Sequence, residues 1–307
     1  GVPLENTDTW QLEHAERSAD LRAMVQATGL GIALLGVGAL RGELQALRDA
    51  IRVVARSGTH ALIVDAQTDS DLRALAQATA SLDEAFFWVG SGGLARELAS
   101  LTDVFDAASA DNAAPSTVPA AGGAVLILVG SLSTVSAQQC AMLRERAGVG
   151  ELVIPPAVLR EGESHAQWAE WQARVGAQLG ARTDLLVRIG RDDAFDPAEG
   201  AHLSTSLAAL VAPFFAQLSG LIATGGETAR AMLCAAGIDS LQLLSEIEPG
   251  VAVARPHGHE RLTVVTKAGA FGSEHALYGA YLHLRGAPQA ALSSVQEANQ
   301  LNSGKTS

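Results

Sequence analysis

Cysteines, aromatic residues and clusters of basic residues are scarce in this chain of 307 residues. Its two cysteines, Cys140 and Cys234, exclude a disulfide framework and indicate a reducing compartment. The formal net charge is −12 and no basic cluster stands out, which argues against nucleic acid and anionic membranes as partners. No uninterrupted run reaches the roughly 18 apolar residues of a membrane-spanning helix. These absences predict a cytoplasmic protein.

Hydrophobic residues make up 48% of the sequence, enough for a large core and for two domains. Apolar runs typical of strands lie at 30–36, 60–66, 85–90, 124–130, 151–156 and 184–190. Amphipathic patterns typical of helices lie between them, at 41–58, 68–82, 134–148, 165–180 and 200–218. Continuous apolar strands that alternate with helices predict an α/β fold with mainly parallel sheets covered by helices.

The alternation is interrupted once, at residues 107–123, where Ala, Ser, Pro and Gly follow one another without periodicity. Such a composition is typical of a flexible linker. We therefore predict a first domain over 1–106 and a second over 124–286. The polar tail from 287 to 307 is expected to be disordered.

Three turns of the second domain place glycine and hydroxyl residues directly after an apolar run: LVGSLS (128–133), IATGGET (222–228) and VVTKAGAFG (264–272). Ligands of parallel α/β sheets bind outside the carboxyl ends of the strands, so the three turns are expected to converge. Glycine lets a ligand approach the backbone, and a helix N-terminus offers free N–H groups to an anion. This pattern predicts a cradle for nucleotide phosphates, with backbone N–H groups, Lys267 and the hydroxyls of Ser131, Ser133, Thr228 and Thr266 as contacts.

A second glycine-rich stretch, GVGALRG (36–42), also lies between a strand pattern and a helix pattern. It is similar to the dinucleotide fingerprint, and Asp65 ends the next strand about where that fingerprint needs its ribose-binding acid. The glycine spacing is one residue too long, so a tight turn is favoured over a nicotinamide site. A Rossmann-type oxidoreductase remains an alternative.

Two polar clusters have structural explanations beside the functional ones. Asp65, Asp69 and Asp71 follow a strand, and they either cap and complement the next helix or bind a ligand. His257 and His259 have no cysteine or carboxylate at metal-ligand spacing, so no metal-binding residues are assigned.

Six segments of the sequence together resemble the four-carbon acid sugar kinases, a bacterial family once described as a domain of unknown function. They are DAQTDSDLRALAQA (65–78), WVGSGGLA (88–95), GSLSTVSAQQ, GGETA, EIEPGVAVA and VVTKAGAFGSEHAL, in this order, and the resemblance spans about residues 1–286. It implies two α/β domains with the active site in the cleft between them. It also implies ATP-dependent phosphorylation of threonate, erythronate or 3-oxo-tetronate.

The resemblance and the pattern of the residues together suggest roles for particular positions. The resemblance implies ATP contacts at Ser131, Gly225, Gly226, Glu227, Thr228 and Gly269, and the pattern of the three turns adds Ser133 and Lys267. Mg²⁺ is expected to bridge the phosphate oxygens, and Glu227 stands where Asp is commoner in the family. The free N–H groups of Gly90, Ser91, Gly92 and Gly93 are expected to hold the carboxylate of the sugar acid. A carboxylate of the first domain is expected to orient or deprotonate the hydroxyl group of that acid. The best candidates are expected in a family segment that this sequence lacks, so Asp65 and Asp69 are the second choice.

The sequence departs from the family at its beginning, where members carry a strand and an acidic loop of the type ADDxTG. Because no such loop occurs here, we expect the chain to begin within the first domain, with a complete nucleotide domain and a partial substrate domain. We therefore expect it to bind nucleotide but to phosphorylate no sugar acid at an appreciable rate. A non-catalytic protein that binds a sugar acid or a nucleotide remains an alternative, and a homo-oligomer is left open.

Overall fold

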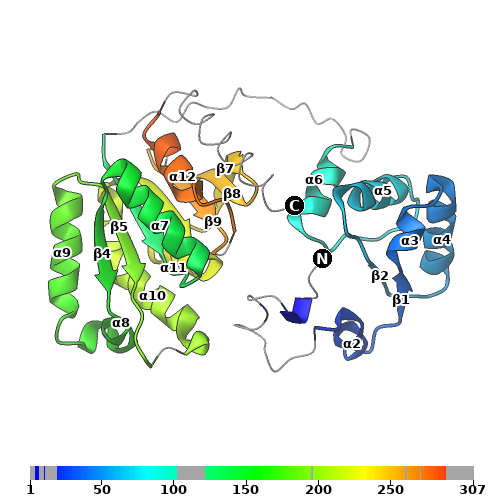
Figure 1. The fold of residues 1–307 in the computed structure, drawn as a ribbon, viewed down its shortest axis with the longest axis horizontal. Helices are drawn as coiled ribbons and strands as arrows, with labels where there is room; N and C mark the ends of the chain where they lie inside the picture. The colour runs from blue at the N-terminus through cyan, green and yellow to red at the C-terminus, as the bar shows by residue number, and fades with distance from the viewer. Residues whose placement is uncertain are drawn as a thin grey trace. The chain divides into compact units, whose positions relative to one another are not determined.

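The computed structural model describes residues 4–6, 10, 19–101, 122–194, 196–259, 261–269 and 271–287 (Figure 1). The chain divides into two compact units, Gly1–Ala113 and Ala114–Ser307. The division falls within the predicted linker 107–123, most of which lies outside the described residues, as does the predicted tail beyond residue 287. Every helix within the described ranges is too short or too polar to span a membrane.

Unit 1 contains a small parallel sheet and several helices. Its elements are η1 (Leu4–Asn6), α2 (Leu21–Gln26), β1 (Ile32–Leu35), α3 (Val37–Leu40), α4 (Leu44–Arg56), β2 (Ala61–Val64), α5 (Asp69–Ala80) and α6 (Gly92–Ala99). β1 and β2 pair in parallel, with Ile32 opposite Ala61. The buried faces of α4, α5 and α6 form the core of the unit, where Ile51, Leu75 and Leu98 pack together. This crossover from β1 through helices to β2 is the predicted α/β pattern.

The predicted strand at 85–90 is wrong, because this segment has no regular secondary structure. Phe87 and Val89 are 83% and 85% exposed, whereas a central strand would bury them. Trp88 lies on the opposite side, where its indole N–H donates to Thr79 of α5 at 3.0 Å. An apolar run becomes a strand only where a neighbouring strand accepts its backbone hydrogen bonds, and here the segment is held by a side chain instead.

The glycine-rich stretch GVGALRG forms a short helix and not the tight turn that the sequence favoured. Gly36 precedes α3, Gly38 lies within it, and Arg41 and Gly42 lead into α4. A dinucleotide fingerprint needs the strand to turn directly into the long helix that binds the pyrophosphate. The intervening α3 removes the structural basis for a Rossmann-type nicotinamide site in this unit.

Unit 2 is built on a seven-stranded sheet with the strand order β4-β5-β3-β6-β9-β8-β7. The strands are β3 (Ala124–Val129), β4 (Gly150–Ile154), β5 (Leu185–Ile189), β6 (Leu218–Thr224), β7 (Leu241–Glu248), β8 (Val251–Pro256) and β9 (Thr263–Lys267). The five strands from β4 to β9 in this order are parallel, and β8 and β7 complete the sheet as an antiparallel hairpin. All six residues of β3 are buried, as expected of a central parallel strand.

Helices cover both faces of this sheet (Figure 1). They are α7 (Thr134–Ala147), α8 (Pro156–Glu161), α9 (Trp168–Gly180), α10 (Gly200–Val211), α11 (Gly226–Ala235) and α12 (Ala276–Leu284), with 3-10 turns at η2 (Gly162–Ser164), η3 (Pro197–Glu199) and η4 (Ala212–Gln217). α7 and α12 pack on one face, and α8 to α11 pack on the other. The predicted helix 200–218 ends early, at Val211, because Pro213 lies in the first turn of η4.

The connections around β3 determine where a ligand can bind. β3 continues into α7 on one face of the sheet, whereas its neighbours β5 and β6 continue into α10 and α11 on the other face. Chain segments that leave adjacent strands in opposite directions open a crevice at the carboxyl ends of those strands. The sheet therefore has its switch point at the end of β3.

Hydrogen bonds at the opposite, amino end of the sheet fix α12 in place. Asp184 accepts from the backbone N–H of Val125 at 2.8 Å, from the Tyr281 hydroxyl at 2.8 Å and from Nε of Arg285 at 2.9 Å. One carboxylate thus joins β3, the start of β5 and α12. This cluster is separate from the turns at the carboxyl ends of the strands.

Candidate nucleotide site

The three glycine-rich turns lie together at the carboxyl edge of the sheet. β3, β6 and β9 are adjacent and parallel, and their last residues Val129, Thr224 and Lys267 are aligned in register. The backbone N–H of Gly225 donates to the carbonyl oxygen of Lys267 at 2.9 Å, and the N–H of Gly130 donates to that of Thr224 at 3.3 Å. The strands therefore end at one level, and the turns that follow them meet.

A chain of hydroxyl groups connects the first turn to the third. The Ser131 hydroxyl donates to Ser133 Oγ at 3.1 Å, Ser133 donates to Ser136 Oγ at 3.1 Å, and Ser136 donates to the carbonyl oxygen of Gly269 at 2.8 Å. Ser133 also caps α7 by accepting from the N–H of Ser136 at 3.1 Å. The predicted residues Ser131, Ser133 and Gly269 are thus neighbours in one network.

The two glycines of the GGET turn have different structural roles. Gly225 has a φ of 101°, a backbone conformation that residues with a side chain rarely adopt. Gly226 is the first residue of α11, and the position of a side chain there is open, with nothing within 4 Å. Gly225 therefore makes the turn, whereas Gly226 leaves the helix N-terminus accessible to a ligand.

The two residues after these glycines face in different directions. Glu227 is 57% exposed and forms an ion pair with Arg230 at 2.9 Å on the surface of α11. Thr228 is 2% exposed, and its hydroxyl lies 3.2 Å from that of Ser204 in α10. A side chain at Gly130 would collide with this hydroxyl. Thr228 therefore joins α10, α11 and the end of β3, and its side chain faces the protein.

Lys267 is the only basic residue in the three turns, and it is almost fully buried, with 3% of it exposed. Its ammonium group donates to the carbonyl oxygens of Ala268, Gly269 and Phe271, each at 2.8 Å. Burial lowers the pKa of Lys267 to about 8. The direct contact with phosphate predicted for Lys267 stays a prediction, since its hydrogens point into the loop that follows β9.

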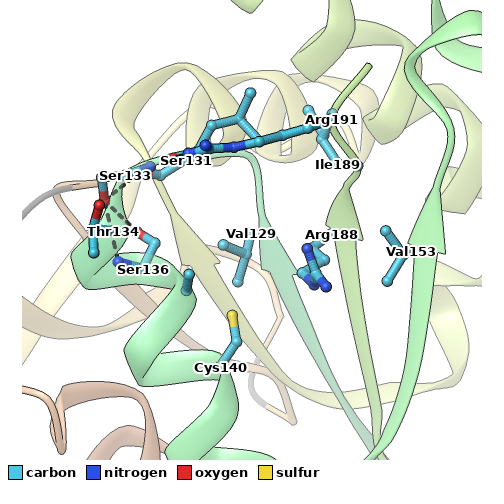
Figure 2. A pocket seen from close by; sticks show the side chains of 13 residues that line it. Val129, Ser131, Ser133, Thr134, Ser136, Cys140, Val153, Arg188, Ile189 and Arg191 are labelled. Carbon is cyan, nitrogen blue, oxygen red and sulfur yellow. Dashed lines mark hydrogen bonds between the residues drawn. The ribbon is translucent and has the colours of Figure 1, made fainter. Parts of the chain in front are cut away.

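A pocket of about 420 Å³ opens beside the serine turn, between the carboxyl ends of β3 and β5. Its apolar lining includes Val129, Val153, Ile189 and Cys140, and Figure 2 shows Val129 of β3 beside Cys140 of α7, in whose core cluster it packs. Arg191 reaches from the end of β5 to the serine turn, where its guanidinium donates to the carbonyl oxygen of Leu132. Burial raises the pKa of the Cys140 thiol to about 11, which keeps it uncharged. The pocket is therefore lined by apolar side chains and by two guanidinium groups, those of Arg188 and Arg191.

In unit 1, one aspartate of the acidic cluster has a structural role, and the other two are exposed. Asp71 and Thr68 form a capping box at the start of α5, and Arg41 binds the Asp71 carboxylate at 3.0 Å. These hydrogen bonds, led by that from Arg41, hold the pKa of Asp71 below its usual range. Asp65 and Asp69 are exposed, at the end of β2 and in the first turn of α5. Capping thus explains Asp71, while the roles of Asp65 and Asp69 stay predictions.

The GSGG stretch of unit 1 lies next to this cluster. Gly92 and Gly93 begin α6, with Ser91 before them. A side chain at Gly93 would lie 2.9 Å from the Cδ1 atom of Leu72 in the first turn of α5, so the two helices approach each other closely at this glycine. A side chain at Gly90 would collide with Leu94 in the same way, whereas the position at Gly92 is open. The beginnings of α5 and α6 are therefore in contact, and only Gly92 is free for close approach of a ligand.

Several residues that hold the turns of the candidate nucleotide site were not predicted from the sequence, although they lie within the segments that carry the family resemblance. Ser136 and Gln139 project from the first turns of α7, and Glu248 ends β7 in the EIEPG segment. Their contacts are with the loop after β9, more than a hundred residues from α7. The helical spacing of Ser133, Ser136 and Gln139 was the available signal, since residues three apart share one face of a helix.

Metal binding by the protein alone is not indicated. Within the part of the chain that the structure describes, no three His, Cys, Asp or Glu side chains gather where they could hold a metal ion. Mg²⁺ in nucleotide sites is usually held by phosphate oxygens, water and one or two carboxylates. Glu227 is the carboxylate at the GGET turn, and its exposed side chain fits that pattern.

The chain matches two family models. One, described as a sugar-binding N-terminal domain, matches residues 1–98, and the other, described as a nucleotide-binding C-terminal domain, matches residues 126–277. The solved structure of a putative tRNA synthase from Salmonella typhimurium shares the fold, with a TM-score of 0.62 at 21% identity over 80% of this chain and 58% of that chain.

Two relatives of known activity are similar over most of the chain. A D-threonate kinase of Cupriavidus necator is 53% identical over 286 residues, which are 92% of this chain and 67% of that protein. A 3-oxo-tetronate kinase of Methylobacterium radiotolerans is 29% identical over 267 residues, which are 83% of this chain and 61% of that protein. The chain thus spans about two thirds of the length of these relatives. It belongs to the four-carbon acid sugar kinase family.

Proposed function

We propose that this protein binds ATP at the turns after β3, β6 and β9 and transfers its γ-phosphoryl group to a hydroxyl of a four-carbon sugar acid, with D-threonate as the first candidate. The observation that supports the proposal most is the alignment of the three strand ends, which brings a positive-φ glycine, an open helix N-terminus and a network of serines together. The similarity to a D-threonate kinase supports the choice of acceptor.

The phosphates are proposed to bind at the N-terminus of α11 and beside the serine turn. The first N–H groups of a helix have no partner within the helix and carry partial positive charge. Gly226 lets phosphate oxygens reach them, because no side chain stands in the way. Contacts from Ser131, Ser133, Glu227, Thr228 and Gly269 are part of this proposal, and for the buried Thr228 the contact is its N–H group. The adjacent pocket is proposed to take the nucleoside.

Phosphoryl transfer depends on positioning and on neutralising charge, and few cations stand at these turns. The ammonium of Lys267 is occupied by backbone carbonyl groups. When bound with the nucleotide, Mg²⁺ supplies the missing positive charge at the phosphate oxygens, and Glu227 is the residue that would hold it.

The acceptor is proposed to bind unit 1. The carboxylate of the sugar acid is assigned to the N–H groups of the GSGG stretch (Gly90, Ser91, Gly92, Gly93), of which Gly92 is open. Asp69 or Asp65 orients the acceptor hydroxyl and accepts its proton. The hydroxyl oxygen bonds to the γ-phosphorus while the bond from that phosphorus to the bridging oxygen breaks, and ADP leaves with the electron pair.

The experiment measures ADP affinity and acid-dependent ADP release with D-threonate, erythronate and 3-oxo-tetronate. Where the chain releases ADP with an acid, Asp69→Asn and Asp65→Asn should lower kcat, by about a hundredfold or more for the general base. Neither change should alter ADP affinity. Asp49→Asn, at an exposed position on α4, is the matched control. Failure to bind ADP would refute the proposal. Binding without release would favour the non-catalytic alternative, and release would show that the predicted inactivity of this chain is wrong.

A further inference from the structure

We infer that Lys267 is a positioning residue for nucleotide phosphates: its buried ammonium draws the carbonyl groups of the following loop inward and so presents the N–H groups of that loop to the ligand. The loop, called the β9 loop here, comprises residues 268–269 and 271–273. The inference rests on the proposed nucleotide site and assigns Lys267 a role other than contact with phosphate.

The first observation is the complete use of the ammonium group. A lysine ammonium group can donate three hydrogen bonds and can accept none. In this structure the group donates to Ala268, Gly269 and Phe271, each at 2.8 Å, and the residue is 3% exposed. A phosphate oxygen could take one of these hydrogens only if a carbonyl group of the loop gave it up. The geometry therefore assigns the charge to holding the loop.

The second observation is that side chains from other elements hold the same loop in the same orientation. Ser136 of α7 donates to the carbonyl oxygen of Gly269 at 2.8 Å. Gln139 of α7 donates to the carbonyl oxygens of Phe271 at 3.2 Å and Ser273 at 2.7 Å. Glu248 of β7 accepts from the N–H of Ser273 at 2.7 Å and from its hydroxyl at 2.9 Å. Three side chains from two elements besides β9, α7 and β7, thus fix the loop before any ligand binds.

The direction of the N–H groups follows from the planarity of the peptide bond. In a trans peptide the C=O of one residue and the N–H of the next point in opposite directions. With the carbonyl groups of Ala268 and Phe271 on the ammonium, the N–H groups of Gly269 and Gly272 point away from it. Loops that turn several N–H groups to one side form concave sites for anions.

The position of Gly269 places its part of the β9 loop beside the other two turns, whereas Gly272 lies nearer to Glu248 and Gln139. A side chain at Gly269 would lie 2.9 Å from the Ser131 hydroxyl and 3.9 Å from the Cα atom of Gly225. The loop therefore borders both the serine turn and the GGET turn, and glycine is needed where they meet. The loop contributes to the same concave surface as the start of α11.

The proton of Lys267 makes this role dependent on pH. The titratable groups that face it are the carboxylate of Glu248 from β7 and the thiol of Cys140 from α7, and both raise the pKa of Lys267. Burial opposes them and is the larger effect, so that the pKa is about 8. A neutral amine has two hydrogens, so one carbonyl group loses its donor as the pH rises through this value. Removing the charge also weakens the attraction for phosphates.

The test compares MgADP affinity by titration calorimetry in the 307-residue chain and two variants. Lys267→Met keeps a side chain of similar length without hydrogens to donate, and it should weaken MgADP binding about tenfold or more. Tyr281→Phe removes a hydrogen bond to Asp184 at the amino end of the same sheet and is the matched control. It should lower the free energy of unfolding and leave MgADP affinity unchanged.

A pH series separates positioning from a purely structural role. Wild-type affinity for MgADP should fall between pH 7 and pH 9, because binding favours the protonated lysine, whereas Lys267→Met should show no such fall. The second ionisation of the terminal phosphate of ADP, with a pKa of about 6, is complete over most of this range. If Lys267→Met does not fold, the wild-type pH series and Gln139→Met decide; this variant removes one of the two α7 donors to the loop and should also weaken MgADP binding.

The outcomes distinguish this inference from the proposed function. Unchanged affinity in a folded Lys267→Met variant would overturn the inference and leave the nucleotide site standing, as would a flat wild-type pH profile. Failure of the wild-type chain to bind MgADP would overturn both. Weaker binding in Lys267→Met together with loss of the pH dependence would support the positioning role.

Discussion

Adjacent glycines in the GGET turn allow a test in which stability and affinity change in different directions. Gly225 has a φ of 101°, and an alanine there would be held in a strained conformation. Gly226 lies in the first turn of α11 and does not have a positive φ. An added methyl group there would meet nothing within 4 Å. The two glycines are neighbours in sequence, yet only the first is needed for the fold.

The expected magnitudes follow from these two environments. Gly225→Ala should lower the free energy of unfolding by about 1–3 kcal/mol, the usual cost of a residue in a sparsely populated backbone region. Gly226→Ala should raise it by about 0.4–1 kcal/mol, because alanine restricts the unfolded chain and fits the native conformation. If phosphate oxygens contact the N–H groups at this point, the methyl group should still weaken ADP binding by about tenfold, the value of one hydrogen bond to a charged group.

Urea unfolding and calorimetric titration with ADP measure both quantities on the same samples. Gly38→Ala is the matched control, since Gly38 also lies in a helix with nothing within 4 Å of the added methyl group. It should change stability without changing ADP affinity. A Gly226→Ala variant with wild-type affinity would refute close approach of the phosphates to α11. Weaker ADP binding by Gly38→Ala would instead point to the GVGALRG stretch of unit 1.

Three further variants or treatments test other parts of unit 2. Thr228→Val should lower the free energy of unfolding by about 1–3 kcal/mol in urea titrations, because the buried Ser204 hydroxyl loses its partner. A thiol reagent at pH 8 should modify the exposed Cys234 and reach Cys140 only after denaturation, since burial raises the pKa of Cys140 to about 11 and its thiolate is scarce below that pH. Asp184→Ala should cost about 1–3 kcal/mol of stability and leave ADP affinity unchanged, because its hydrogen bonds tie α12 to the amino end of β3.

Most of the architecture of unit 2 could be predicted from periodicity. β3 and β5 are short apolar runs between helical patterns, and buried parallel strands have this appearance in general. The prediction for 85–90 failed although the same kind of run is present there. The difference lies in the neighbours: β3 has β5 and β6 beside it, whereas Phe87 and Val89 extend into solvent. Hydrophobicity marks what can be buried, and the pairing of strands determines what is buried.

The candidate site shows the same limit at the level of side chains. The sequence correctly brought the turns after β3, β6 and β9 to one edge, because parallel strands have their carboxyl ends on the same side. It could not show which polar groups face the ligand. Thr228 and Lys267 read as ligand contacts in the sequence, yet the Thr228 hydroxyl faces Ser204 and the ammonium faces its own loop.

A chemical reason explains the orientation of the Lys267 ammonium, while its contact with phosphate stays a prediction. Turns that offer many N–H groups to an anion must turn their carbonyl groups the other way, and buried carbonyl groups need donors. The β9 loop meets this need with the ammonium of Lys267, the hydroxyl of Ser136 and the amide of Gln139. A polar residue next to such a glycine-rich turn can therefore either face the ligand beside the backbone N–H groups or donate to the backbone carbonyl groups on the other side. For Lys267 the outcome depends on its burial among the neighbouring strands of the sheet, which the motif alone does not determine.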